Sequence, residues 1–435
     1  MIPAKKLISI FDDIFVRPCL FQSNIFSGTT KPKEVWSSLL WLLSGNDGLM
    51  GDYIDKFEKQ LAQYLQVLDC ACFAAGRMAL YAILESLNIG QGDEVIIPAY
   101  TCVVVPNAII YRGAKPVYCD IETERFSIDP AKLEQCITPR TRAIIAQHTY
   151  GIPCRIKEIT EVARKHQISV IEDCAHALGG KLDGEKLGSI APISFSSLDY
   201  TKIISTGTGG FASTKDPELA RKIRQIKQRS GFITEWQLTK LIFGYSYSYI
   251  LSNPYIFPAG KYIRLLLDKL KCCFDFKEYL CLKIPDNYPA RLTNIQSKLG
   301  LSQLSDLNKN LDHRREIVRH IDAVLKANQS IINDESLSPS WLRYPFLVEN
   351  RSSFLKKTAK YFQFGIWFCT IAQNRRDHFE QIHYTKGSCP VAEWVTNHIV
   401  SIPTHYRIKG LDRLCEDLTK LKPVRNKNNY FVFVA

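Results

Sequence analysis

The sequence lacks several features that would assign it to a class at once. Its 435 residues contain no internal repeat and no low-complexity linker, which excludes repeat architectures and fibrous structure. The 56 Lys and Arg residues are scattered and form no single basic tract. The net charge of +13 suits phosphorylated substrates, nucleic acid or an anionic membrane alike. Because no basic tract stands out, we expect no nucleic-acid partner.

The cysteines indicate neither a metal site nor a secreted protein. All 14 are spread along the chain, and neither Cys70 with Cys72 nor Cys272 with Cys273 has the spaced Cys and His partners of a zinc site. No metal is therefore expected. Residues 1–6 do not resemble a secretory signal. We expect a cytoplasmic protein whose thiols are free.

The chain is long enough for two domains. Its length exceeds what one hydrophobic core usually supports, and 46% apolar residues can fill two cores. We predict an N-terminal arm over 1–50, irregular to about residue 45, and a large domain over 51–235. An aromatic insertion over 236–288 and a smaller α+β C-terminal domain over 289–435 follow. Within the last, residues 290–330 predict one long helix or a broken pair of helices.

The large domain predicts a sheet wound by helices. Short apolar runs alternate with helical stretches such as 156–166, which is typical of an α/β fold with a mostly parallel sheet between two helical layers. The predicted strands are 94–97, 116–119, 143–146, 169–171 and 192–195. In such sheets, ligands bind at the carboxyl ends of the strands. Asp173 and the turn Pro98–Thr101 fall at such ends.

The stretch 241–260 contains no charged residue and is about long enough to span a bilayer core. Serines, an asparagine and two prolines interrupt it, and Lys240, Lys261 and Arg264 flank it. This tyrosine-rich mixture favours a cover over a site or a dimer interface. Peripheral contact with a membrane is the alternative.

Lys202 and Asp173 carry the strongest chemical signal. A lysine amine and an acid at the ends of apolar strands are what pyridoxal 5'-phosphate requires: a Schiff-base partner for its aldehyde and an anion for its ring nitrogen. Ser197 precedes the lysine by five residues, close enough for its hydroxyl to bind the phosphate. The turn Gly76-Arg77 opens a helix, whose backbone N–H groups can hold an anion. An ordinary surface lysine beside a strand-terminal aspartate is the alternative for the first pair alone.

With these residues in place, the chain resembles the DegT/StrS-type sugar aminotransferases over about residues 50 to 410. The segments that carry the resemblance are Gly51–Tyr64, Gly76–Leu80, Gly92–Thr101, Pro116–Asp120, His148–Gly151, Glu172–His176, Ser197–Lys202 with Gly209-Gly210, Leu299–Leu304 and Ser401–Pro403. The resemblance implies fold type I of the pyridoxal-phosphate-dependent transferases, with 51–235 as the cofactor-binding domain. It also implies a homodimer.

The resemblance assigns roles to individual residues. Lys202 becomes the lysine bonded to the cofactor, Asp173 the partner of the ring nitrogen, and Ser197 a phosphate ligand. The phosphate ligands further include Gly76 and Arg77, whereas His176 and Cys102 become neighbours of the cofactor ring. The freed lysine amine would carry the proton during amino transfer.

Three departures from the family pattern indicate a divergent branch. Cys102 stands where an aromatic residue commonly stacks on the cofactor, and gives a smaller and softer contact. Pro289 replaces an asparagine that often reaches the partner subunit's phosphate, so Asn287 or Arg291 is left as a substitute. Thr208 replaces an acid before the glycine pair.

These observations predict an aminotransferase that moves an amino group, expected to come from glutamate, onto a keto sugar. The implied substrate is nucleotide-activated and the implied context is the synthesis of surface polysaccharide or glycan. Substrate specificity is expected in the arm before residue 50, in the insertion and in Gly365–Phe368. A catalytically silent or divergent paralogue, acting at a membrane surface or on a non-sugar keto substrate, is the alternative, although retention of Lys202, Asp173 and Ser197 disfavours a silent one.

Overall fold

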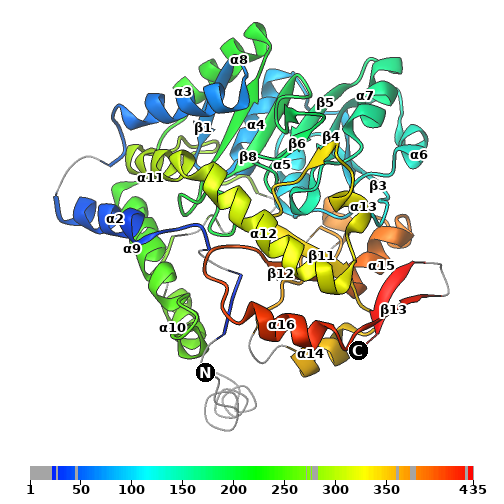
Figure 1. Ribbon diagram of the computed structural model, residues 1–435. Helices are drawn as coiled ribbons and strands as arrows, with labels where there is room; N and C mark the ends of the chain where they lie inside the picture. Colours follow the sequence, from blue (N-terminus) through cyan, green and yellow to red (C-terminus); the bar gives the residue numbers. More distant parts are fainter. Residues whose placement is uncertain are drawn as a thin grey trace.

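The structure is a computed structural model that describes residues 22–25, 28–44, 48–270, 272–274, 276, 283–358, 362–372, 379–426 and 430–434. Its centre is a seven-stranded sheet with the order β1-β9-β8-β5-β4-β2-β3 (Figure 1). The strands are β1 Asp69–Phe73, β2 Glu94–Pro98, β3 Lys115–Cys119, β4 Thr141–Gln147, β5 Ser169–Asp173, β8 Ile193–Ser197 and β9 Gly210–Thr214. All neighbouring pairs are parallel except the two that β9 makes with β1 and β8. The predicted mostly parallel sheet is confirmed.

Alternate residues of each strand face two different cores, because side chains in a strand point to opposite faces in turn. Val95, Ile97 and Ile145 pack with helices α4 (Gly76–Ser86) and α5 (Val104–Tyr111), whereas Ile96 and Ile144 pack toward α7 (Ile156–Lys165) and the C-terminal part. The helices around the sheet are α3 Tyr53–Leu65, α4 Gly76–Ser86, α5 Val104–Tyr111, α6 Pro130–Leu133, α7 Ile156–Lys165 and α8 Pro217–Arg229. This gives the expected three layers.

The C-terminal part is a smaller α+β unit, as predicted. The long helical region is a broken pair, α11 Asn294–Ser305 and α12 Leu307–Leu325, and Thr293 begins the first helix with a capping box to Gln296. The remaining elements are α13 Gln329–Ile332, β11 Arg343–Leu347, α14 Arg351–Thr358, α15 Pro390–His398, β12 Ile399–Pro403, α16 Leu411–Leu418, β13 Lys422–Arg425 and β14 Phe431–Val434. A small sheet joins β6 Lys181–Leu182 and β7 Glu185–Lys186 to β10 Leu337–Ser338.

The expectation of an irregular chain to about residue 45 is wrong. Residues Pro32–Ser44 form helix α2, with a proline at its first position and Glu34 in its first turn. Glu34 is buried, accepts the Lys31 N–H at 2.7 Å and accepts the Ser302 hydroxyl at 2.7 Å. Packing of α2 against α9 and α11 therefore stabilises a helix whose own pattern is weak. Residues 1–21 lie outside the described part of the chain.

The predicted insertion contains two helices, α9 Glu235–Leu251 and α10 Phe257–Lys269. Leu241, Ile242 and Tyr245 of α9 are buried, whereas α10 exposes Ile263, Leu266 and other apolar side chains. The exposed large apolar residues of this region are Trp236, Phe243, Ile250, Tyr255, Ile256, Ile263, Leu265, Leu266, Leu270 and Ile284. Among the described helices, none combines the length and the apolar character of a membrane span.

Candidate active site

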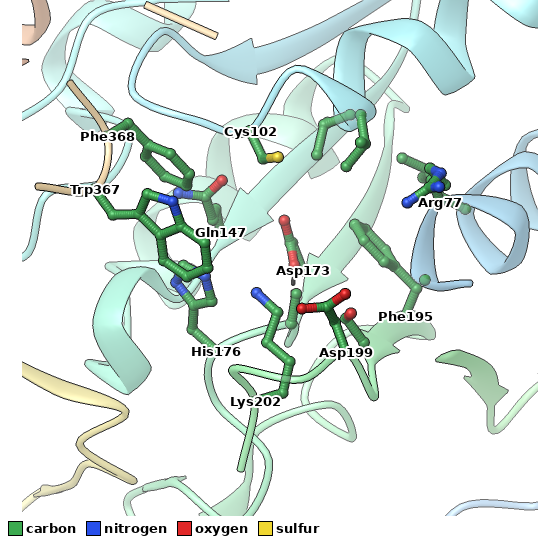
Figure 2. A pocket seen from close by; sticks show the side chains of 16 residues that line it. Arg77, Cys102, Gln147, Asp173, His176, Phe195, Asp199, Lys202, Trp367 and Phe368 are labelled. Atoms are coloured by element: carbon green, nitrogen blue, oxygen red, sulfur yellow. Dashed lines mark hydrogen bonds between the residues drawn. The ribbon is translucent and has the colours of Figure 1, made fainter. Parts of the chain in front are cut away.

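All seven residues predicted for the site line one pocket at the carboxyl edge of the sheet (Figure 2). These residues are Gly76, Arg77, Cys102, Asp173, His176, Ser197 and Lys202. They come from the ends of β5 and β8, from the beginning of α4 and from the loops after β2 and β8. The cavity measures about 110 Å³, many times the space that one water needs.

Lys202 lies in the loop between β8 and β9. The two strand ends pair through Ser197 and Gly210, and the Lys202 N–H donates to the carbonyl of Asp199 at 3.0 Å. Among the described residues, the Lys202 amine has no hydrogen bond and no ion pair; it lies 5.0 Å from the centre of the Trp367 ring. Burial lowers the pKa of this amine, against the nearby Asp199, Cys102 and Asp173. A lowered pKa increases the neutral fraction, which is the form that can attack a carbonyl.

Asp173 is the last residue of β5 and is 4% exposed. Its carboxylate accepts the N–H of Ala175 at 2.9 Å. Burial raises the pKa of this carboxyl to about 6, and the Ala175 N–H and Lys202 only partly oppose that rise. In Figure 2, Asp173 lies between Cys102 above and Lys202 below. The carboxylate therefore points into the cavity and would gain from a cationic partner there.

The beginning of α4 comes unusually close to the end of β8. A Cβ atom at Gly76 would lie 3.0 Å from the carbonyl oxygen of Ser196, and one at Gly210 would lie 2.3 Å from the Cα of Gly76. Only glycine fits at this junction, which brings the first N–H groups of the helix next to Ser197. A helix N-terminus with a hydroxyl beside it favours an anion such as a phosphate.

Arg77 lines the same pocket but is directed to the far side from Lys202 (Figure 2). Its guanidinium donates to the carbonyl of Phe276 at 3.0 Å and lies 5.5 Å from the centre of the Phe276 ring. The segment after α10 thus reaches the wall of the pocket.

His176 forms part of an aromatic wall. Its ring stacks on Trp367 with a centroid distance of 5.8 Å and an interplanar angle of 12°, and its Nδ1 accepts the Tyr150 N–H at 3.3 Å. Burial, with the cations Lys202 and Arg343 nearby, lowers the pKa of His176 well below its ordinary value. The imidazole is therefore neutral and serves as a flat apolar surface.

Cys102 lies in the pocket wall, and burial raises the pKa of its thiol. The thiol is accordingly protonated and makes a small, polarisable contact where an aromatic ring was expected from the family pattern. The neighbouring Thr101 donates to the amide oxygen of Gln147 at 2.6 Å.

One cluster near the pocket has the composition of a metal site. The ligand atoms of His148, Glu172 and Cys174 lie within 4.8 Å of one another. Glu172 already accepts backbone N–H groups from the 188–191 loop at 2.7 to 2.8 Å, and His148 lies 3.1 Å from its carboxylate. The Cys154 N–H donates to the other ring nitrogen of His148 at 3.0 Å. These bonds satisfy both groups and hold the 188–191 loop to the Glu172 side chain of β5.

The pocket also includes side chains that were not predicted as site residues. Gln147, Phe195, Asp199, Trp367 and Phe368 line it together with Leu80, Val104, Val105 and Ala175. Gln147 follows the predicted strand 143–146 and Phe195 ends the predicted strand 192–195, so both could have been found from their positions, whereas Asp199 lies in the loop after β8. Trp367 and Phe368 come from the C-terminal part. Substrate specificity was expected in the Gly365–Phe368 stretch, but neither residue was predicted to line the pocket.

The groups present fit pyridoxal 5'-phosphate: an amine with a lowered pKa, a buried carboxylate and a glycine-lined anion site around one cavity. Fold and pocket together define a pyridoxal-phosphate-dependent transferase of fold type I. The model of the DegT/DnrJ/EryC1/StrS aminotransferase family matches residues 30–249 and 277–418, and the chain belongs to this family. It is an aminotransferase that uses pyridoxal phosphate, as expected, while residues 250–276 with α10 lie outside the match.

The chain is also similar to individual proteins and to solved structures. The chain is 32% identical over 292 residues to the GDP-perosamine synthase of Escherichia coli O157:H7, covering 66% of this chain and 67% of that protein. It is 34% identical over 269 residues to the GDP-perosamine synthase of Caulobacter vibrioides, of which the alignment covers 61%, and 62% of this chain. Among solved structures, the putative sugar aminotransferase Spr1654 of Streptococcus pneumoniae matches with a TM-score of 0.71 and 22% identity, over 91% of this chain and 96% of that one. This likeness confirms the fold.

Proposed function

We propose that the protein transfers the amino group of an amino acid, glutamate, to the keto group of a nucleotide-activated sugar. The observation that carries the proposal is the convergence of Lys202, Asp173, Ser197 and Gly76 on one cavity. Its relatives support the class of acceptor, since two of them are GDP-perosamine synthases and another is a UDP-N-acetyl-3-dehydro-alpha-D-glucosamine 3-aminotransferase. Synthesis of a surface glycan is the proposed context.

We assign each residue a role that its surroundings allow. Pyridoxal phosphate, when bound, supplies an electron-accepting ring that makes the Cα–H bond of the donor labile. Lys202 holds the cofactor and then moves the proton, for which its lowered pKa suits it. Asp173 faces the ring nitrogen and keeps it protonated. Ser197, with the backbone N–H groups of the Gly76-Arg77 turn, holds the phosphate.

His176 and Cys102 contribute surface and exclude water. The His176 ring is neutral and stacks within an aromatic wall, so we place it against the organic part of the ligand. Cys102 forms a softer contact on the cofactor ring. Trp367 and Phe368, which enter from the C-terminal part, are the proposed contacts to substrate.

The test is the visible spectrum of the purified protein with candidate donors. The wild type should show the band of a lysine-bound cofactor, and glutamate should discharge it. The Lys202→Ala variant should fold and lose the band and turnover, whereas Lys298→Ala, in the surface pocket near Tyr53, should change neither. Normal turnover of Lys202→Ala would refute the assignment.

We further propose a homodimer whose interface includes the α9–α10 surface, defined by the exposed apolar residues of these helices. Leu266 and Leu270 are 56% and 63% exposed, and apolar side chains gathered this way indicate a binding surface. The Arg77 contact to Phe276 connects the same segment to the pocket. The boundaries 51–235, 236–288 and 289–435 remain our proposal for the organisation of the chain.

Two measurements separate a dimer from membrane contact. Leu266→Glu with Leu270→Glu should convert the dimer to a monomer in analytical ultracentrifugation. Leu68→Glu, equally exposed at 57% but outside these helices, should leave the dimer intact. If the double variant stays dimeric and loses only sedimentation with anionic liposomes, the surface binds membranes instead.

We propose a reducing compartment, the cytoplasm, as the site of action. The 12 cysteines in the described part of the chain are all free thiols, and free thiols in this number are typical of reducing compartments.

A further inference from the structure

Arg343 is a buried cation for which the described part of the chain provides no anion. It is the first residue of β11 and is 2% exposed. Neither of its terminal nitrogens, Nη1 and Nη2, has a hydrogen-bond partner among the described residues. Burial lowers the pKa of this guanidinium to about 10, so it stays charged at neutral pH. A buried charge without a partner costs stability, and such a cost is common at binding sites.

The second buried arginine of this region shows what a structural role requires. Arg314 is also 2% exposed. It donates to the side chain of Asn310 at 3.0 Å, to the carbonyl of Leu342 at 3.1 Å and to the hydroxyl of Thr404 at 2.9 Å. Arg314 therefore connects α12 to β11 and the segment after β12. Arg343 makes no comparable connection among the described residues.

Arg343 lies directly behind the wall of the active site. Its guanidinium carbon lies 4.2 Å from the centre of the Trp367 ring, and the Lys202 amine lies 5.0 Å from the same centre. Both cations therefore lie within 5.0 Å of the centre of the same indole ring. The charge of Arg343 also contributes to the lowered pKa values of Lys202 and His176. The positive charge of Arg343 therefore affects titratable groups inside the pocket.

The indole of Trp367 is held by its backbone rather than by its ring nitrogen. The carbonyl of Trp367 accepts hydrogen bonds from the hydroxyls of Tyr100 and Tyr150, and the N–H of Phe368 donates to Tyr100 at 2.6 Å. Among the described residues, the indole nitrogen has no hydrogen-bond partner. A fixed backbone with a ring held only by stacking allows the ring to turn about its side-chain torsions.

We propose that Arg343 binds the α-carboxylate of the amino donor, and that the Trp367 indole turns aside to admit it. The inference rests on the proposed function. In an amino acid, the carboxylate carbon lies about 2.5 Å from the amine nitrogen. To react, the amine of the donor must come close to the Lys202 amine, whose place on the cofactor it takes. A cation one ring away from Lys202 is therefore placed for a carboxylate. The diphosphate of an activated sugar is separated from the keto carbon by the sugar ring and lies farther away.

The test compares two isomeric donors, glutamine and isoglutamine, which differ in whether the α or the γ position carries the carboxylate. Glutamine retains the α-carboxylate of glutamate, and isoglutamine replaces it by an amide. For the wild type, discharge of the visible band should require on the order of 10- to 100-fold more isoglutamine than glutamine, as expected for a charged hydrogen bond. Arg343→Met should raise the required concentration of glutamine by a similar factor and leave that of isoglutamine unchanged. Arg343→Lys should recover part of the loss, and the spectrum before donor addition should be that of the wild type.

A second readout does not depend on turnover. In the cofactor-free protein, Arg343→Met should raise the melting temperature because it removes an uncompensated charge, whereas Arg314→Met should lower it. If Arg343→Met instead melts as low as Arg314→Met, Arg343 is a structural residue and the inference is wrong. If amino acids discharge the band and Arg343→Met needs no more donor, the carboxylate assignment fails alone. If none of the common amino acids discharges the wild-type band, the proposed function and the carboxylate assignment both fail.

Discussion

Replacing Asp173 by asparagine should stabilise the cofactor-free protein and slow the enzyme. Burial raises the pKa of Asp173 to about 6 from an ordinary 3.8. An acid with a higher pKa in the folded state binds more protons there than in the unfolded state, so its ionisation costs stability as pH rises from 3.8 through 6. The difference of about two pKa units corresponds to about 3 kcal/mol at pH 8. Asparagine has no such charge and can still accept the Ala175 N–H.

The assay is denaturant unfolding of the cofactor-free wild type and of Asp173→Asn between pH 4.5 and 8. The variant should be more stable by up to about 3 kcal/mol at pH 8, and the advantage should shrink as pH falls through 6. With cofactor bound, the variant should react on the order of 10²-fold more slowly, because the anion opposite the ring nitrogen is lost. A stability difference that does not change with pH would show that the Asp173 carboxyl is not buried as described. An unchanged rate would mean that another group meets the ring nitrogen.

Two other substitutions test the framework of the site. Gly210→Ala should weaken cofactor binding and cost about 1 to 3 kcal/mol of stability, because a Cβ there would lie 2.3 Å from the Cα of Gly76. Titration with the cofactor measures the affinity, and melting curves measure the stability. An affinity equal to that of the wild type would refute the close junction. Glu58→Gln should destabilise the protein by about 3 kcal/mol, since the buried Glu58 carboxylate pairs with Lys227 at 2.5 Å. The cofactor spectrum should not change, because neither Glu58 nor Lys227 lines the pocket; an altered spectrum would contradict this separation.

The sequence predicted the sheet and the cofactor side of the pocket because both depend on local pattern. Apolar runs of three or four residues mark the strands, and the residues that follow them, such as Asp173, are brought to one edge by the parallel arrangement. Strands β1 and β9 were not predicted; β9 begins at Gly210, within the glycine pair, and pairs antiparallel with both neighbours. The sequence of a single strand does not indicate whether it pairs parallel or antiparallel with its neighbours.

The remainder depends on contacts between distant segments. Helix α2 exposes Trp36 and Leu43 while it buries Val35, so its apolar residues lie on more than one side and give no clean stripe. Trp367 and Arg343 belong to the C-terminal part, and the chain gives no signal that they meet across one ring beside Lys202. A buried arginine without an acid can be recognised only when its neighbours are known.

The hairpin that carries Lys202 limits where this protein can vary in length. Loops usually accept insertions, but here Ser197 and Gly210 pair at the strand ends and fix both ends of the loop. One residue added between Ser197 and Lys202 would lengthen their span by up to about 3.5 Å, more than a hydrogen bond to a shared ligand tolerates. Length variation is accommodated away from this loop, as in residues 250–276, which the family match does not cover. New specificity in this scaffold is accordingly expected from exchanged side chains and added peripheral helices, with the lysine loop kept at constant length.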